Sequence, residues 1–164
     1  MELASQLVGT WKGAGKGEFP TIEPFEYEEE VVFARPPNKP FLSYVQKTKS
    51  KTGSPMHTES GFLRVFEDGV CEFCIAQPTG LCEIEQGKIE RHADGSIRWD
   101  SQAGQETTQG DNIIRGERNK EPGTFMVVRR FKLVGDVLSY NLLMATSTTP
   151  KLTHHLSATL EKQQ

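Results

Sequence analysis

Histidine and methionine side chains are the residues of this chain best suited to holding a metal-containing ligand. His57 follows Met56, His154 and His155 are adjacent near the C-terminus, and Met144 lies in an apolar segment shortly before them. A zinc site needs three or four ligands, and no such set accompanies these histidines. Haem iron needs one axial imidazole with apolar walls around the macrocycle. From these residues alone, a haem ligand and ordinary packing histidines both stay open.

The cysteines indicate strand packing and reduced thiols. Cys71, Cys74 and Cys82 are odd in number, and no signal peptide is recognisable at the start of the chain, which predicts a cytoplasmic protein. Cys71 and Cys74 have C-x-x-C spacing but fall in an alternating segment, residues 70–75. Positions three apart on a strand point to opposite faces, so a dithiol site is not expected.

Other familiar signatures of catalysis do not occur. The sequence contains no nucleophile elbow, P-loop, zinc-protease helix motif or dinucleotide fingerprint. The glycines between Gly9 and Gly17 alternate along a strand, so they are not interpreted as a phosphate cradle. The acidic run 26–30 is interpreted as a solvated strand face, although Glu29 breaks the alternation on the apolar side.

The elements that must position these side chains are strands, because the dominant period of the sequence is two. Trp11, Gly13 and Phe19 alternate with Lys12 and Glu18, for example, and the glycines allow bending or close approach. Strands are expected over residues 11–19, 25–33, 41–48, 57–66, 70–77, 81–86, 89–91, 96–101, 112–117, 124–133, 137–146 and 152–160. Turn signals separate them, among them residues 67–69, 86–88 and 134–136.

This pattern predicts an all-β protein, in which about ten short strands form a single antiparallel up-and-down β-barrel over residues 1–164. At most a short helical turn around residues 3–7 precedes it. Closure removes exposed strand edges, and a barrel of this size is wide enough to hold a ligand.

The composition excludes several classes of protein. The chain has 164 residues, 35% hydrophobic residues and a formal net charge of −3. The acidic balance argues against nucleic-acid binding, and no apolar run is long enough for a membrane helix. In a barrel each strand needs only one apolar face, so a modest apolar content is sufficient.

Several motifs, taken in order, resemble those of a known family. They are Gly9-Thr10-Trp11-Lys12-Gly13-Ala14-Gly15, Phe19-Pro20-Thr21-Ile22, Phe25-Glu26-Tyr27, Pro40-Phe41-Leu42, Pro55-Met56-His57-Thr58-Glu59, Gly61-Phe62-Leu63-Arg64, Ala76-Gln77-Pro78-Thr79-Gly80, Met144-Ala145 and His154-His155-Leu156-Ser157-Ala158-Thr159-Leu160. Across residues 9–160 the chain resembles the nitrobindins, ferric haem β-barrel proteins related to lipocalins and fatty-acid-binding proteins.

The resemblance implies one haem b per chain and a set of residues around it. His155 would be the axial ligand of the iron, and Thr21 would contact the haem edge. The remaining positions that match the lining of the haem pocket are Met56, His57, Gln77 and Met144. Lys120 is a weaker candidate for neutralising a propionate.

Strand alternation by itself favours the other histidine. His154 shares the parity of Leu156, Ala158 and Leu160, so an unbroken strand would direct His154 toward the core. A β-bulge at the start of this strand would instead direct His155 inward. We follow the family resemblance and predict His155, with His154 as the alternative.

The resemblance implies an enzyme that isomerises peroxynitrite to nitrate with ferric haem and binds nitric oxide with ferrous haem. No residue is assigned to proton transfer. The alternative is a non-enzymatic carrier of an apolar small molecule such as a fatty acid, because the same barrel can serve either function. A nitric-oxide sensor ranks third, since no output domain is recognisable.

Overall fold

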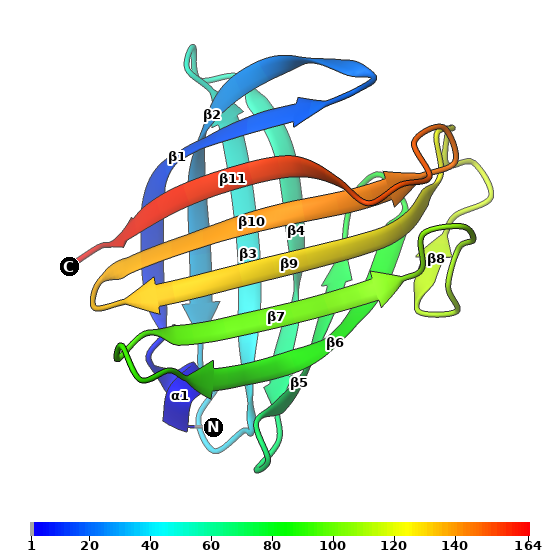
Figure 1. Ribbon diagram of the computed structural model, residues 1–164. Helices are drawn as coiled ribbons and strands as arrows, with labels where there is room; N and C mark the ends of the chain where they lie inside the picture. The colour runs from blue at the N-terminus through cyan, green and yellow to red at the C-terminus, as the bar shows by residue number, and fades with distance from the viewer. Residues whose placement is uncertain (1) are drawn as a thin grey trace.

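The computed structural model describes residues 2–164, which form a closed antiparallel β-barrel (Figure 1). After a short helix α1 (Glu2–Ser5), the strands are β1 (Gly9–Phe19), β2 (Ile22–Ala34), β3 (Phe41–Ser50), β4 (Pro55–Val65), β5 (Val70–Ala76), β6 (Leu81–Arg91), β7 (Ile97–Gly104), β8 (Ile113–Arg115), β9 (Thr124–Val134), β10 (Val137–Thr146) and β11 (Thr153–Lys162). The sheet order is β5-β4-β3-β2-β1-β11-β10-β9-β7-β6-β8, and pairing of β5 with β6 closes the ring.

The predicted ten-stranded barrel and its N-terminal helical turn are confirmed, with one strand outside the ring. The predicted strand 112–117 is reduced to the short β8, which pairs with β6 only. The turn expected at residues 86–88 is wrong, because β6 runs unbroken through Gly87. A Cβ atom at Gly87 would collide with the carbonyl oxygen of Asp100 on β7, so this glycine serves close strand packing.

The glycines of β1 likewise permit close approach. A Cβ atom at Gly13 would overlap the carbonyl oxygen of Thr159 on the neighbouring β11. At Gly15 and Gly17 the missing side chains leave room for the rings of Tyr27 and Phe25 on β2. The glycine alternation therefore lets β1 pack tightly and gives aromatic rings space at the barrel wall.

One end of the barrel is filled by α1 and apolar side chains. Ala4 and Leu7 are buried, and the indole Nε1 of Trp11 donates a 2.7 Å hydrogen bond to the carbonyl oxygen of Leu7. Beyond this plug a layer of aromatic rings crosses the interior, with Trp99 stacked on Phe131 at 4.5 Å between centroids. Within residues 2–164 no helix has the length and apolar character needed to cross a membrane.

Past the aromatic layer, the interior contains a polar cluster built around Arg129 of β9. Its Nε donates to Glu85 at 2.6 Å, and its two Nη atoms donate to Glu59 at 2.8 and 3.1 Å. Nη2 also donates to Glu83 at 3.0 Å. All four side chains are almost completely buried, so the guanidinium joins β4, β6 and β9 across the barrel.

Glu29 belongs to the same polar interior, which corrects part of the expectation for the acidic run 26–30. Its neighbours Glu28 and Glu30 do face outward, but Glu29 is buried and accepts hydrogen bonds from Gln46 and Tyr140 at 2.5 and 2.8 Å. The break in alternation marked an inward carboxyl group. It is buried because two polar partners on other strands satisfy its oxygens.

Four buried carboxyl groups face one buried guanidinium, so the cluster cannot be fully ionised. Burial raises the pKa of Glu29 to about 7 and that of Glu83 to about 8. Oε2 of Glu83 is buried without a hydrogen-bond partner, which costs less for a neutral carboxyl group than for a carboxylate. For Glu59 burial acts in the same direction, but Arg129 and further hydrogen-bond donors bring the pKa down to about 2.

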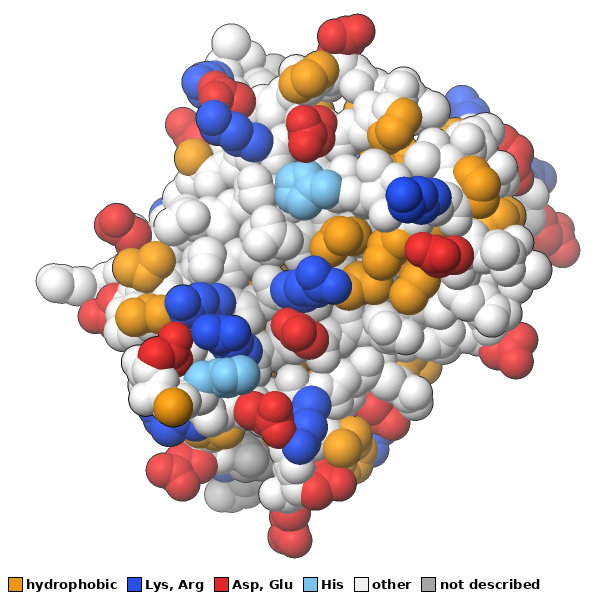
Figure 2. All heavy atoms as spheres, in the orientation of Figure 1, with side chains coloured by type: hydrophobic (Ala, Val, Ile, Leu, Met, Phe, Trp, Pro, Cys, Tyr) orange, Lys and Arg blue, Asp and Glu red, His pale blue; other side chains and the backbone are white. Residues whose placement is uncertain are grey.

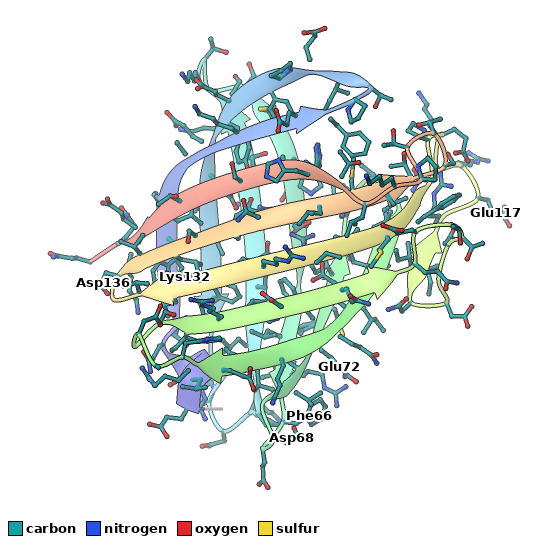
Figure 3. The ribbon with its side chains drawn as sticks, viewed as in Figure 1. Phe66, Asp68, Glu72, Glu117, Lys132 and Asp136 are labelled. Carbon is teal, nitrogen blue, oxygen red and sulfur yellow. The ribbon has the colours of Figure 1, made fainter. Side chains whose placement is uncertain are left out.

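The face of the barrel that Figure 2 shows carries interspersed charges of both signs. At the hairpins, charged side chains extend away from the barrel, as Lys132 and Asp136 do near the β9–β10 turn and Asp68 does between β4 and β5 (Figure 3).

Replacing Gly13 by Ala is expected to destabilise the barrel by about 1–3 kcal/mol, because the added methyl group has no space against β11. Gly116→Ala is the matched control, since a Cβ atom there meets only the carbonyl oxygen of Gly80 at 3.6 Å. Urea unfolding of both variants measures the difference. Equal stability of the two would contradict the close-approach role of Gly13.

Stability should fall as pH rises from about 4.5 to about 8, with Glu83 contributing at most roughly 1 kcal/mol per pH unit. In this interval the carboxyl group is ionised in the unfolded chain and protonated in the folded one, so deprotonation favours unfolding. Glu83→Gln cannot ionise and should show a shallower decline in urea unfolding between pH 5 and 8. An unchanged pH dependence in this variant would show that Glu83 does not hold the proton.

Candidate functional site

A cavity of about 540 Å³ opens at the end of the barrel opposite α1. Its walls are largely apolar, with side chains that include Phe25, Met56, Val127, Leu142, Met144 and Leu156. Half-buried polar residues, among them His57, Gln77 and His155, lie toward its mouth. The buried Glu59, Glu83 and Arg129 line its inner end, which we call the floor.

A β-bulge in β11 directs His155 into this cavity. Leu142 of β10 pairs with Leu156, whereas the next residue, Leu143, pairs with His154, so His155 is the extra residue between two pairs. An extra residue reverses the alternation along a strand and re-aims a side chain. The bulge thus reconciles strand parity with an inward His155.

The ring of His155 is held in one orientation by its surroundings. Nδ1 lies 3.1 Å from the carbonyl oxygen of Glu18, which can only accept, so Nδ1 carries the hydrogen and Nε2 keeps a free lone pair. Phe19 and Phe25 contact the ring edge-on, at centroid distances of 5.5 and 6.4 Å. Burial lowers the pKa of His155, which favours the neutral imidazole that binds metals.

His154 lies on the other side of the strand. Its Nδ1 is 3.4 Å from the carboxylate of Glu18 on the outer surface, and the side chains are 38% and 65% exposed. It does not line the cavity that His155 enters. The geometry accordingly favours His155 over His154 as the residue available to a ligand.

The remaining sequence-predicted residues divide into two groups. Met56 and His57 on β4, Gln77 just after β5 and Met144 on β10 come together with His155 around the cavity. Thr21 is exposed in the β1–β2 turn, outside the cavity lining, and Lys120 is exposed in the loop between β8 and β9. The structure therefore assembles five of the six predicted lining residues.

Sequence reasoning missed the polar floor. Glu59 was part of a matched motif but received no role, and Arg129 was not considered. A signal for Arg129 exists, because it shares the parity of the apolar Val127 and Phe131 within a strand. An arginine on the buried face of a strand indicates inward carboxyl partners.

The residues present fit a haem. Nε2 of His155 could supply a nitrogen ligand to the iron, the carbonyl oxygen of Glu18 behind the ring fixes its tautomer, and apolar walls suit a macrocycle. No group of three or more His, Cys, Asp or Glu residues within 2–164 is arranged to hold a metal ion directly. One imidazole with a free Nε2 beside apolar walls is suited to a metal carried by a macrocycle.

Comparison with known proteins agrees with this geometry. Residues 2–162 match the family described as "THAP4-like, heme-binding beta-barrel domain". A peroxynitrite isomerase of Nocardia farcinica is 41% identical over 157 residues, covering 95% of this chain and 86% of the relative. Peroxynitrite isomerase 2 of Mycobacterium marinum is 42% identical over 164 residues, covering 99% and 94%.

A solved structure shares the whole architecture. The crystal structure of Rv2717c from M. tuberculosis superposes with a TM-score of 0.88 at 38% identity, covering 99% of this chain and 96% of the other. The match extends over the barrel and the cavity end alike. The chain therefore belongs to the THAP4-like haem-binding β-barrel family, the nitrobindins.

Proposed function

We propose that this protein holds one haem b in the cavity through His155 and isomerises peroxynitrite to nitrate when the iron is ferric. In the ferrous state it would bind nitric oxide. The observation that carries the proposal is the bulge that directs His155 inward, with Nδ1 engaged by Glu18 and Nε2 free. The relatives named peroxynitrite isomerase, 41% and 42% identical, support the activity.

Ferric haem would supply the Lewis-acidic centre at which peroxynitrite rearranges. The chain's own residues would bind and orient the haem. His155 would provide a nitrogen ligand to the iron, while Phe19 and Phe25 hold the imidazole ring in place. The apolar side chains of Val127, Leu142 and Met144 exclude water from the inner part of the cavity walls. Thr21, exposed in the β1–β2 turn, would contact the edge of the haem.

The alternative of a fatty-acid carrier is disfavoured by the floor. Carriers of this type bind a carboxylate with an inward arginine and tyrosine, and Arg129 with Tyr44 superficially offers such a pair. Every nitrogen of Arg129, however, already donates to a carboxyl group of this chain. A ligand carboxylate at the floor would meet further acidic groups, so an anionic lipid gains no ion pair there.

Replacing His155 by Ala should abolish haem binding, since the imidazole whose Nε2 is free to bind iron is then lost, whereas His154→Ala should retain it. Purified protein reconstituted with haem is examined for its Soret band, and circular dichroism confirms that each variant folds. A band lost only in the His154 variant would overturn the assignment of the ligand.

The rate at which peroxynitrite is converted to nitrate tests the activity. The haem-loaded natural chain should accelerate conversion to nitrate, and the chain without haem should not. A natural chain that takes up no haem and co-purifies with lipid would support the carrier instead.

A further inference from the structure

His57 and Glu59 form a histidine–carboxylate pair at the wall of the cavity. Both residues lie on β4 two positions apart, so their side chains share the inward face. Nε2 of His57 is 3.2 Å from Oε2 of Glu59. The His57 side chain is 38% exposed and that of Glu59 only 2%, so the pair leads from the open cavity to the buried floor.

Glu59 is held rigidly as the acceptor of this pair. Both Nη atoms of Arg129 donate to it in bidentate fashion, and the hydroxyl of Tyr44 donates to Oε1 at 2.8 Å. A bidentate guanidinium is the strongest partner of an ionised carboxylate. The low pKa of Glu59, about 2, agrees with permanent ionisation.

An ionised Glu59 determines where His57 carries its hydrogen. A carboxylate only accepts, so Nε2 of His57 must donate to it, and Nδ1 is left with a lone pair. The neighbouring floor groups do not compete for this hydrogen. Arg129 is committed to Glu59, Glu83 and Glu85, while Glu29 is occupied by Gln46 and Tyr140.

The two cavity histidines therefore have opposite tautomers. His155 donates from Nδ1 and offers Nε2, whereas His57 donates from Nε2 and offers Nδ1. One ring is prepared to bind a metal, and the other is prepared to take up a proton, with a carboxylate behind it to stabilise the imidazolium.

We propose that His57 is the proton acceptor of the cavity and that Glu59 is its positioning residue. This inference rests on the proposed function for its substrate and concerns peroxynitrite in its protonated form, peroxynitrous acid. The O–H bond of the acid breaks and an N–H bond forms at Nδ1, which leaves the peroxynitrite anion and an imidazolium paired with Glu59. The imidazolium later releases the proton to water, so the net change is peroxynitrous acid to nitrate and a proton.

The tautomers are measurable on the chain without haem. Nitrogen-15 NMR of labelled histidine should show a hydrogen on Nε2 of His57 and on Nδ1 of His155. Glu59→Gln should move the His57 hydrogen to Nδ1, because the amide can donate to Nε2, and His155 serves as the unchanged internal reference. Finding His57 with its hydrogen on Nδ1 in the natural chain would overturn the inference.

Kinetics of the haem-loaded protein test the proton transfer itself. His57→Gln keeps a donor for Glu59 but removes the base, so it should retain the Soret band and lose roughly 100-fold in isomerisation, the lower end for a positioned base. Its rate should also depend less on pH than that of the natural chain. His92→Gln, in the β6–β7 turn, is the matched control and should behave as the natural chain.

Three other outcomes would each overturn the inference. Loss of the Soret band in His57→Gln would make His57 a haem-holding residue and overturn the proton-acceptor role. A variant as active as the natural chain at every pH would do the same while leaving the proposed function intact. A loaded natural chain without isomerase activity would overturn both, whatever the NMR result.

Discussion

The ligand end of the barrel depends on the hydrogen bonds that the buried guanidinium of Arg129 donates to three carboxyl groups. This guanidinium bridges carboxyl groups from β4 and β6 to β9, three strands of which no two are paired neighbours in the ring. Buried ion pairs contribute little net stability because desolvation is costly, but removing one partner leaves a charge unpaired. The cluster is therefore better understood as a device that holds the cavity floor in one arrangement.

The interior of the barrel is divided into layers along its axis. At one end α1, Trp11 and the aromatic rings form a dry core, and Arg129 borders it at 6.0 Å from the centroid of Phe73. The polar cluster follows, and the cavity opens beyond it. Because the core fills only part of the barrel, the remaining length can be hollow without loss of the packing that supports the fold.

At the ligand end of the barrel, two hydrogen bonds each fix the tautomer of one histidine. Glu18 fixes the tautomer of His155 from the backbone, and Glu59 fixes that of His57 from a side chain. The first depends on a bulge in β11 that brings the ring beside β1, and the second on the buried arginine. In each case a hydrogen-bond acceptor of the protein determines which ring nitrogen of the histidine carries the hydrogen.

The period of two along the chain was sufficient to predict strands, hairpins and a closed barrel, because each strand has one apolar face regardless of its partners. The alternation of strand side chains also showed that Glu29 departs from the pattern. It could not identify the residues that donate hydrogen bonds to its carboxyl group. It failed at Gly87, where the sequence signal of a turn and that of close strand packing are alike.

The order of motifs along the chain indicated the family, the haem and five residues that do meet around the cavity. Only the tertiary structure decided which of His154 and His155 points inward, and that Arg129, Glu59 and Glu83 form the floor. The reason is physical: a bulge depends on the register between β10 and β11, and a buried ion cluster depends on strands that meet only when the barrel closes.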